Sequence, residues 1–221
     1  MKLRMSILAT GVAALWLVGC SATGGSGVSA DGKVGAAMDV VKAATVSEDD
    51  LKSAALQLRA AEDKQARVAP PNNRYAKRLA RLTKNHVNED GLVLNYKVYL
   101  SPQVNANATP DGSIRVYSGL MDLMNDQEML GIIGHEIGHV KLGHSMSQMR
   151  TAYMASAGRK AAAASSSAGG VLAASQLGDL GEALINSQFS QSQETASDDY
   201  GLAFMKKYGY NTKALETAFR K

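Results

Sequence analysis

Two histidines and a glutamate lie close together in the segment Gly131 to His144, which reads GIIGHEIGHVKLGH. His135 and His139 are four positions apart, so on an α-helix both imidazole rings project from one face and can share a metal ion. Glu136 stands next to the first histidine, where it can act as the general base of a hydrolytic reaction. This H-E-x-x-H pattern predicts a catalytic zinc site, with His135 and His139 as metal ligands and Glu136 as the catalytic residue.

A third ligand must come from elsewhere in the chain, because catalytic zinc usually has three protein ligands and keeps one position for water. The metzincin pattern is absent, since it requires glycine and histidine where this chain has Leu142 and Ser145. His144 follows His139 by five positions, about 140 degrees around an unbroken helix. We therefore expect His144 to be a capping or hydrogen-bonded histidine and not a metal ligand.

An acidic residue further along is the remaining source of the third ligand. Glu194 and Asp198 are four positions apart on an expected helix and face the same way. The spacing favours Glu194 as the ligand, and Asp198 as the acceptor of the free ring N–H of a ligand histidine. On spacing alone, three other acids remain as alternatives to Glu194: Asp199, Glu182 and Glu216.

The two histidines must be held on a helix that is itself buried. Asn125 or Asp126 can cap the start of such a helix, and Glu128 falls in its first turn. Apolar residues then recur at Leu130, Ile132, Ile133, Ile137, Val140 and Leu142. This periodicity predicts a half-buried, rigid helix, which is the support that metal ligands need.

Two segments with alternating apolar residues predict β-strands before the helix that carries His135 and His139, here called the metal helix. They are Leu92 to Leu100 and Ser113 to Leu120. The residues between them contain two prolines and end in Asp111 and Gly112, so they are expected to form a loop closed by a tight turn. We expect the two strands to form part of a small sheet packed on the metal helix.

Helices are expected over most of the remaining chain. The expected segments are one or two helices within 34–66 with Ser47 as a cap, a basic helix over 73–86, a helix over 180–209 and a short helix over 212–220. The basic residues between Arg74 and Lys84 predict a solvated helix face, and His86 is expected at the surface or the edge of the core. The expected fold class is therefore α+β, mostly helical, with a small β-sheet.

The length and net charge of the chain limit the number of domains and the kinds of partner that can be expected. At 221 residues and 45% hydrophobic content, the chain suits one domain with a tether. The net charge of +4 includes Lys2 and Arg4, and subtracting these two charges from +4 leaves +2 for the rest of the chain. This charge is too small to indicate a nucleic-acid partner.

The start of the chain has the features of an export signal. A short basic region, MKLRM, precedes the apolar run SILATGVAALWLV, which is shorter than a membrane span requires. The run ends in Leu17, Val18, Gly19 and Cys20, and this segment resembles the lipobox of bacterial lipoproteins. The resemblance implies cleavage before Cys20, which would carry three acyl chains and anchor the protein in a membrane.

The residues after the lipobox predict where the domain lies. Ser21 in place of aspartate implies sorting to the outer membrane of a Gram-negative bacterium, with the body of the protein on the periplasmic side. The glycines and serines that follow predict a flexible linker. The expected organisation is a signal peptide over 1–19, the lipidated cysteine and linker over 20–33, and a zinc metallopeptidase domain over 34–221.

Several motifs in a fixed order resemble those of a known peptidase family. They are NYKVY, SIRVYSGLMDLM, HEIGHVKLGH and NSQFSQSQETASDDYG, within residues 73 to 218 and behind a lipobox. The chain resembles the LoiP/YggG group of outer-membrane lipoprotein metallopeptidases, which belongs to the HtpX and CAAX-prenyl-protease-like family of zinc peptidases. The resemblance implies a zincin-like metallopeptidase fold of the gluzincin type, one zinc ion and polypeptide substrates.

The resemblance also implies roles for particular residues. The acid pair that follows F-S-x-x-Q in the family supplies the third zinc ligand and its neighbour, which correspond to Glu194 and Asp198. The strand before the metal helix borders the substrate cleft in the family and can pair with the substrate backbone. The residues that match this strand, preceded by Asn105 and Ala106, are Ser113, Ile114, Arg115, Val116 and Tyr117.

The chain departs from the family pattern at four places. Ala196 and Ser192 stand where the family commonly has glutamate and arginine, and Asn107 stands where a bulky apolar residue is usual. The first two replace no metal ligand, whereas Asn107 bears on substrate preference. The family also continues with a further helix and an H-P segment after the position of Lys221, so the domain over 34–221 is expected to lack that segment.

Together these features predict a zinc endopeptidase that is anchored to the outer membrane through Cys20 and degrades misfolded or unassembled envelope proteins. Envelope proteins are also expected as partners. The alternative is a non-catalytic zinc-binding envelope lipoprotein that acts as a chaperone or scaffold, in which four protein ligands would close the zinc site. A scaffold with a chance H-E-x-x-H sequence would bind no zinc.

Overall fold

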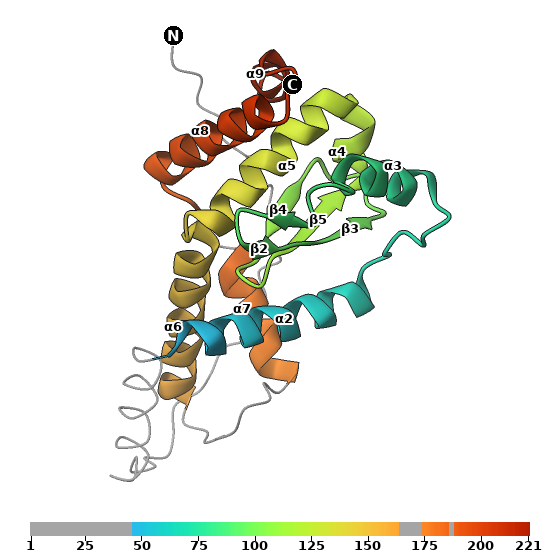
Figure 1. Ribbon diagram of the computed structural model, residues 1–221. Coiled ribbons are helices and arrows are strands. Elements are labelled where there is room, and N and C mark those ends of the chain that lie inside the picture. Colours follow the sequence, from blue (N-terminus) through green and yellow to red (C-terminus); the bar gives the residue numbers. More distant parts are fainter. Residues whose placement is uncertain (1–45, 164–173, 186–187) are drawn as a thin grey trace, which may run out of the picture.

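The computed structural model describes residues 46–163, 174–185 and 188–221 (Figure 1). The helices are α2 (Glu48–Gln65), α3 (Arg74–Thr83), α4 (Ser118–Leu123), α5 (Asp126–Lys141), α6 (His144–Ala163), α7 (Ala174–Ile185), α8 (Gln191–Lys207) and α9 (Lys213–Ala218). The strands are β1 (Asn88–Glu89), β2 (Leu92–Val93), β3 (Asn95–Tyr99), β4 (Ala106–Ala108) and β5 (Ser113–Tyr117). The predicted α+β class, mostly helical with small sheets, is confirmed.

The predicted signal peptide and lipid anchor are not part of the described structure. The expected signal peptide, Cys20 and the linker fall in residues 1–33, which are outside the described residues. Within the part of the chain that the structure describes, no helix is both long and apolar enough to cross a membrane.

A three-stranded sheet packs beside α5. Its strand order is β3-β5-β4, with β3 parallel and β4 antiparallel to β5. β5 is therefore the central strand, and its Ile114 and Val116 side chains are fully buried in the core. Figure 1 shows the sheet between α5 on one side and α2 on the other.

The metal helix forms as the sequence predicts. The Asn125 side chain accepts hydrogen bonds from the backbone N–H groups of Gln127 and Glu128, and the Glu128 carboxylate accepts one from the Asn125 N–H. This capping box satisfies the first backbone donors of α5. Nearly the whole of α5 is buried, but Leu142 is 45% exposed, because it follows the last helical residue and does not face the core.

Helix α8 packs closely against α5 in the opposite direction. Gly138 faces Ser197, and Gly134 faces Gly201 and Phe204, so glycines line the α5 side of the contact. A Cβ atom at position 134 would lie 2.7 Å from the Phe204 ring, which is too close for a side chain. The absence of side chains at these positions lets the two backbones approach, and this approach sets the distance between residues of α5 and α8.

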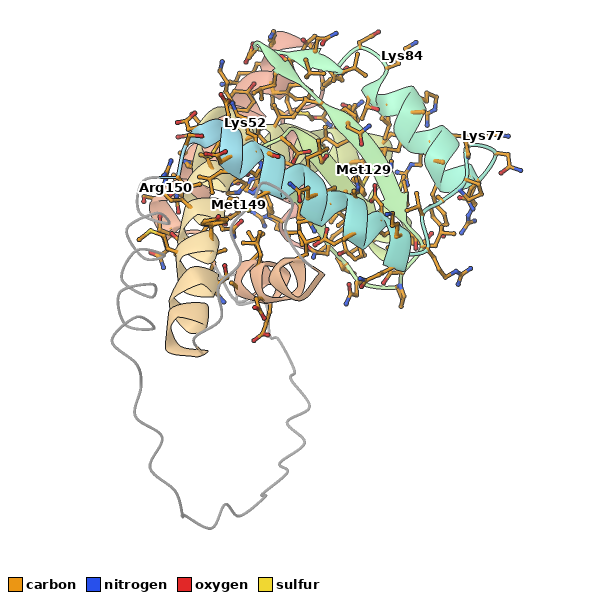
Figure 2. The ribbon with its side chains drawn as sticks, turned by 90° about the horizontal axis from the view of Figure 1, so that it is seen from below. Lys52, Lys77, Lys84, Met129, Met149 and Arg150 are labelled. Carbon is orange, nitrogen blue, oxygen red and sulfur yellow. The ribbon has the colours of Figure 1, made fainter. Side chains whose placement is uncertain are left out.

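A second hydrophobic cluster joins α2, α6 and α7. Its fully buried members include Leu51 and Ala55 of α2 and Met149 of α6, and Leu180 of α7 is 1% exposed. Figure 2, which views the molecule from below, shows Met149 beside α2. The predicted cap of α2 is present, since the Ser47 side chain accepts a hydrogen bond from the Asp50 N–H.

The strands differ from the two that the alternation predicts. The segment Leu92 to Leu100 is divided, because β2 pairs with β1 in a hairpin whereas β3 joins the larger sheet. The second predicted strand ends at Tyr117, and α4 follows. The predicted loop also contains β4, whose sequence Ala-Asn-Ala has low intrinsic strand preference and depends on pairing with β5.

The long late helix is two helices and not one. α7 ends at Ile185, and α8 begins at Gln191 after the cap residue Ser190, whose side chain accepts a hydrogen bond from the Gln193 N–H. Serine followed three positions later by glutamine is a signal for a helix start. The predicted helix over 180–209 therefore has the right secondary structure but misses this boundary.

His86 is buried, so of its two predicted positions, the surface and the edge of the core, the surface is wrong. Its side chain is fully buried, its Nε2 atom lies 2.8 Å from the Tyr210 hydroxyl, and its Nδ1 atom lies 3.5 Å from the Glu89 carboxylate. The rings of Phe204 and Tyr208 pack edge-on against it. Apart from Glu89, these neighbours lie more than 100 positions away in the chain, so no local pattern could indicate them.

Candidate metal centre

Two imidazole nitrogens face each other in the interior of the domain. His135 and His139 lie one turn apart on α5, and their Nε2 atoms are 3.0 Å apart. Both residues are buried, with 7% and 2% of their surfaces exposed. The spacing of four residues thus directs both rings to one side of the helix, as the sequence predicts.

Glu194 brings a carboxylate to the same point. It lies in the first turn of α8, and its carboxylate oxygens are 3.5 Å from His135 Nε2 and 3.9 Å from His139 Nε2. One ligand atom from each of the three residues lies within 4.8 Å of the others. Two imidazole nitrogens and a carboxylate oxygen are the donors of a gluzincin-type zinc site, so these residues fit a zinc ion.

The other acids considered from the sequence do not join this group. Among the residues that the structure describes, one cluster of three or more histidine, cysteine, aspartate or glutamate side chains could hold a metal, and it contains Glu194. Asp199 is outside this cluster, Glu182 lies on α7, and Glu216 of α9 pairs with Arg220. The tertiary structure therefore favours Glu194 among the four acids.

Asp198 contacts His135 on the ring nitrogen that faces away from this group. Its Oδ1 atom lies 2.9 Å from His135 Nδ1. Burial opposes the protonation of His135, but the hydrogen bond with Asp198 and the neighbouring carboxylates raise the pKa of this histidine above its ordinary value. A carboxylate that accepts the Nδ1–H leaves the Nε2 lone pair free to bind a metal.

Burial sets the protonation of His139 and Glu136. It lowers the pKa of His139 to about 3, and the charges of His135 and His144 act in the same direction. The His139 ring is therefore neutral at neutral pH and has a lone pair for a metal. Burial raises the pKa of the Glu136 carboxyl to about 7. A carboxyl group that titrates near neutral pH can both accept and release a proton.

His144 lies beside His139, although an unbroken helix would keep the two apart. α5 ends at Lys141, and Gly143 adopts a φ of 76° that turns the chain before α6 begins at His144. His144 Nδ1 lies 3.3 Å from His139 Nδ1 and 3.1 Å from the Ser197 hydroxyl. The assumption of an unbroken helix is wrong, whereas the expectation of a hydrogen-bonded histidine outside the metal group agrees with this geometry.

Two aromatic residues outside the predicted set of site residues also contact the histidines of the site. The Phe189 ring stacks on His139 with centroids 3.8 Å apart and planes inclined by 19°. Phe219, which follows α9, packs edge-on against His135 at 5.4 Å. Phe189 belongs to the F-S-x-x-Q motif, so the motif held a signal for its position, whereas nothing near Phe219 in the sequence indicates this contact.

The strand predicted to bind substrate has no free edge. Residues Ser113 to Tyr117 form β5, which is paired with β3 on one side and β4 on the other. The prediction that Ser113, Ile114, Arg115, Val116 and Tyr117 pair with a substrate backbone is therefore wrong. The outer side of β3 is bonded to residues 67–69, so the open edge among the described strands of this sheet belongs to β4, which packs beside α5.

Comparisons with known proteins show which family the chain is similar to. Residues 72–220 match the model of peptidase family M48. The chain is 41% identical over 222 residues to metalloprotease YcaL of Escherichia coli (strain K12), covering 99% of this chain and 86% of that protein. It is 42% identical over 224 residues to metalloprotease LoiP of the same organism, covering 100% of this chain and 86% of LoiP. The mitochondrial metalloendopeptidase OMA1 of Arabidopsis thaliana is 26% identical over 137 residues, which cover 60% of this chain and 26% of OMA1.

Proposed function

The chain belongs to peptidase family M48 and is a zinc metalloendopeptidase, and we propose that His135, His139 and Glu194 hold its zinc ion. The observation that carries this proposal is the convergence of the two Nε2 atoms and the Glu194 carboxylate, with ligand atoms within 4.8 Å of one another. A site with three protein donors keeps one position for water, as catalytic zinc sites do. Among the described residues this donor set has three protein ligands, whereas a structural zinc site is closed by four, so it gives the non-catalytic alternative no support.

Glu136 is the proposed general base and general acid. When bound, zinc supplies Lewis-acid polarisation of the scissile carbonyl and makes water more acidic. Glu136 accepts a proton from the attacking water and delivers it to the nitrogen of the departing amine. Its buried position supports both steps, because burial raises the pKa of its carboxyl to about 7.

Asp198 is the proposed positioning residue for His135. By accepting the hydrogen bond from His135 Nδ1–H, it holds the ring with Nε2 toward His139 and Glu194. Glu194 and Asp198 lie on the same face of α8 because they are four positions apart. One helical turn therefore supplies both the proposed metal ligand and the residue that positions His135.

The substrate is proposed to be an extended polypeptide that binds along β4. The outer edge of Ala106–Ala108 faces no other described strand, and backbone N–H and C=O groups at a sheet edge can pair with an added strand. β4 packs beside α5, which carries Glu136. Asn107 of β4 accepts a hydrogen bond from Arg59, so the strand is held from α2 as well as from β5.

The proposed cellular role is the degradation of misfolded or unassembled envelope proteins at the periplasmic side of the outer membrane. The support is the sequence Leu-Val-Gly-Cys at 17–20, which resembles a lipobox, followed by Ser21. Replacing Cys20 with Ser in a Gram-negative host should prevent labelling by radioactive palmitate and release the protein from the outer-membrane fraction. A Cys20→Ser protein that stays in that fraction would contradict lipid anchoring.

Cleavage of an unfolded protein tests the assignment of the site. The purified chain should cleave casein, lose this activity after chelation and regain it with zinc. Glu136→Gln should bind zinc as the wild type does and should cleave at least about 100-fold more slowly, because a positioned general base contributes a factor of this size or more. Glu182→Gln is the matched control on α7, and its activity should be unchanged. Full activity of Glu136→Gln would overturn the role of Glu136.

A further inference from the structure

His144 is brought to the metal centre by the turn at Gly143. The left-handed φ of 76° at Gly143 ends the path of α5, and α6 starts with His144. As a result, His144 Nδ1 lies 3.3 Å from His139 Nδ1, on the side of the His139 ring that faces away from His135. The mechanism proposed above gives His144 no role.

The two proposed ligand histidines make matching contacts. Each directs its Nε2 atom toward the other and toward Glu194, so each has Nδ1 on the outer side. A neutral imidazole carries one N–H, and a ring that binds metal through Nε2 must carry that proton on Nδ1. His135 donates this proton to Asp198. His139 needs an acceptor in the equivalent place, and the group there is His144 Nδ1.

We propose that His144 is a positioning residue for zinc binding, whose Nδ1 atom accepts a hydrogen bond from His139 Nδ1–H and thereby keeps the His139 Nε2 lone pair free. The inference rests on the proposed ligands, His135, His139 and Glu194. His144 would thus accept the Nδ1–H of His139 as Asp198 accepts that of His135, except that the acceptor is a neutral side chain and not a carboxylate.

The tautomer of His144 follows from this proposal. If Nδ1 of His144 accepts, its own proton is on Nε2, and the Ser197 hydroxyl, 3.1 Å away, shares the single lone pair of this Nδ1 as a second donor. In the opposite arrangement, the proton of His144 is on Nδ1, and His139 Nδ1, 3.3 Å away, must then be unprotonated so that two N–H groups do not face each other, which puts the His139 proton on Nε2. That proton would point at His135 and Glu194 and would block the metal position.

Phe189 also contacts the His139 ring, but it restricts the orientation of the ring and does not affect its tautomer. It stacks on the face of His139 with centroids 3.8 Å apart, which restricts the tilt of the imidazole. A ring stacked face to face has no lone pair directed at either nitrogen, so Phe189 cannot select which nitrogen carries the proton. Selection of the tautomer therefore falls to the contact with His144.

Zinc affinity, measured by competition with a chelating indicator, tests the proposal. His144→Ala should bind zinc about 10- to 100-fold more weakly than wild type, the range found when the partner of a ligand histidine is removed. His144→Asn can place an amide oxygen near the position of Nδ1 and should recover most of this loss. Ser147→Ala, an exposed change one turn along α6, is the matched control and should bind as wild type.

Three outcomes of the affinity measurement would overturn the proposal. The first is His144→Ala with wild-type affinity, and the second is His144→Asn as weak as His144→Ala, since the acceptor would then be irrelevant. The third is a loss in His144→Ala that Ser147→Ala matches. Failure of the wild-type chain to bind zinc would instead overturn the proposed function, so the two failures are distinguishable.

The imidazole nitrogens give a second test that needs no variant. In long-range proton–nitrogen NMR spectra of the zinc-loaded protein, His144 should be the tautomer with the proton on Nε2 and His139 the tautomer with the proton on Nδ1. A His144 ring protonated on Nδ1 would overturn the proposal, even if His144→Ala bound zinc weakly.

Discussion

The Asp90 carboxylate accepts a hydrogen bond of 2.6 Å from the Tyr200 hydroxyl and so ties the β1–β2 turn to α8. Asp90 also accepts from Lys207 through its other carboxylate oxygen, at 2.9 Å, and its backbone carbonyl accepts from Lys141 at the end of α5. One residue of the turn therefore contacts both helices that carry the proposed zinc ligands.

Replacing Asp90 with Ala should lower the free energy of unfolding by about 1–3 kcal/mol. The change removes the acceptor for Tyr200 and puts a residue without a local hydrogen bond at a φ of 47°, where asparagine and aspartate are tolerated best. Asp90→Asn is the matched control, because it keeps an acceptor and tolerates this φ, and it should lose less than about 1 kcal/mol. Urea unfolding of the zinc-free proteins measures both, and equal stability of Asp90→Ala and wild type would show that the turn does not hold the helices.

Gly138→Ala should weaken zinc binding although position 138 holds no ligand. A Cβ atom there would lie 3.1 Å from Tyr200 Cβ and 3.2 Å from the Ser197 backbone, so α8 must move outward, and Glu194 moves with it. We expect a loss of stability of about 1–3 kcal/mol and a higher zinc dissociation constant.

Gly178→Ala is the control for this substitution. Nothing lies within 4 Å of a Cβ atom at Gly178 of α7, so alanine there should keep zinc affinity and raise stability by up to about 1 kcal/mol through its helix preference. Equal zinc affinity of Gly138→Ala and wild type would contradict the view that close packing of α5 and α8 sets the ligand distances.

Glu194→Ala should weaken zinc binding by more than about 100-fold, because loss of a ligand exceeds the loss from its supporting residues. Asp199→Ala, five positions along the same helix and exposed, removes an equal charge and should bind zinc as wild type. Metal content after dialysis and a chelator competition measure the effect. A Glu194→Ala protein that retains stoichiometric zinc would place the third ligand on another residue.

Asp63 should make stability depend on acid pH. Burial opposes its ionisation, but hydrogen bonds from Arg115, Lys97 and Tyr99 hold the pKa of its carboxyl well below its usual range. The folded-state pKa is lower than the unfolded one, about 3.9, so the contribution to stability is complete above roughly pH 5. It declines as pH falls through the unfolded pKa toward the folded one.

The variant Asp63→Asn should therefore lose about 2–4 kcal/mol of stability at pH 7, since it leaves the buried Arg115 unpaired, and the difference from wild type should shrink below pH 4. Asp49→Asn, an exposed change on the same helix, should have a small effect at both pH values. Urea unfolding of zinc-free protein at pH 7 and pH 3.5 provides the measurement. A difference between Asp63→Asn and wild type that is equal at the two pH values would contradict this account.

Features that depend on neighbours along the chain follow from the sequence. His135 and His139 share a helix face because hydrogen bonds within the helix repeat every turn, and Asn125 and Ser47 cap helices through residues three positions away. The pairing of Glu194 with Asp198 is local in the same sense.

Features that depend on packing between distant segments were decided by the tertiary structure. Spacing allowed four acids as the third ligand, and only the approach of α8 to α5 at Gly138 brings Glu194 to the histidines. The left-handed turn at Gly143 brings His144 beside His139, and strand pairing gives the free edge to β4 and not to β5. The donors within each element can be read from the sequence, because backbone geometry is local. Which of these donors meet depends on contacts between residues far apart in the chain, and these contacts exist only in the folded domain.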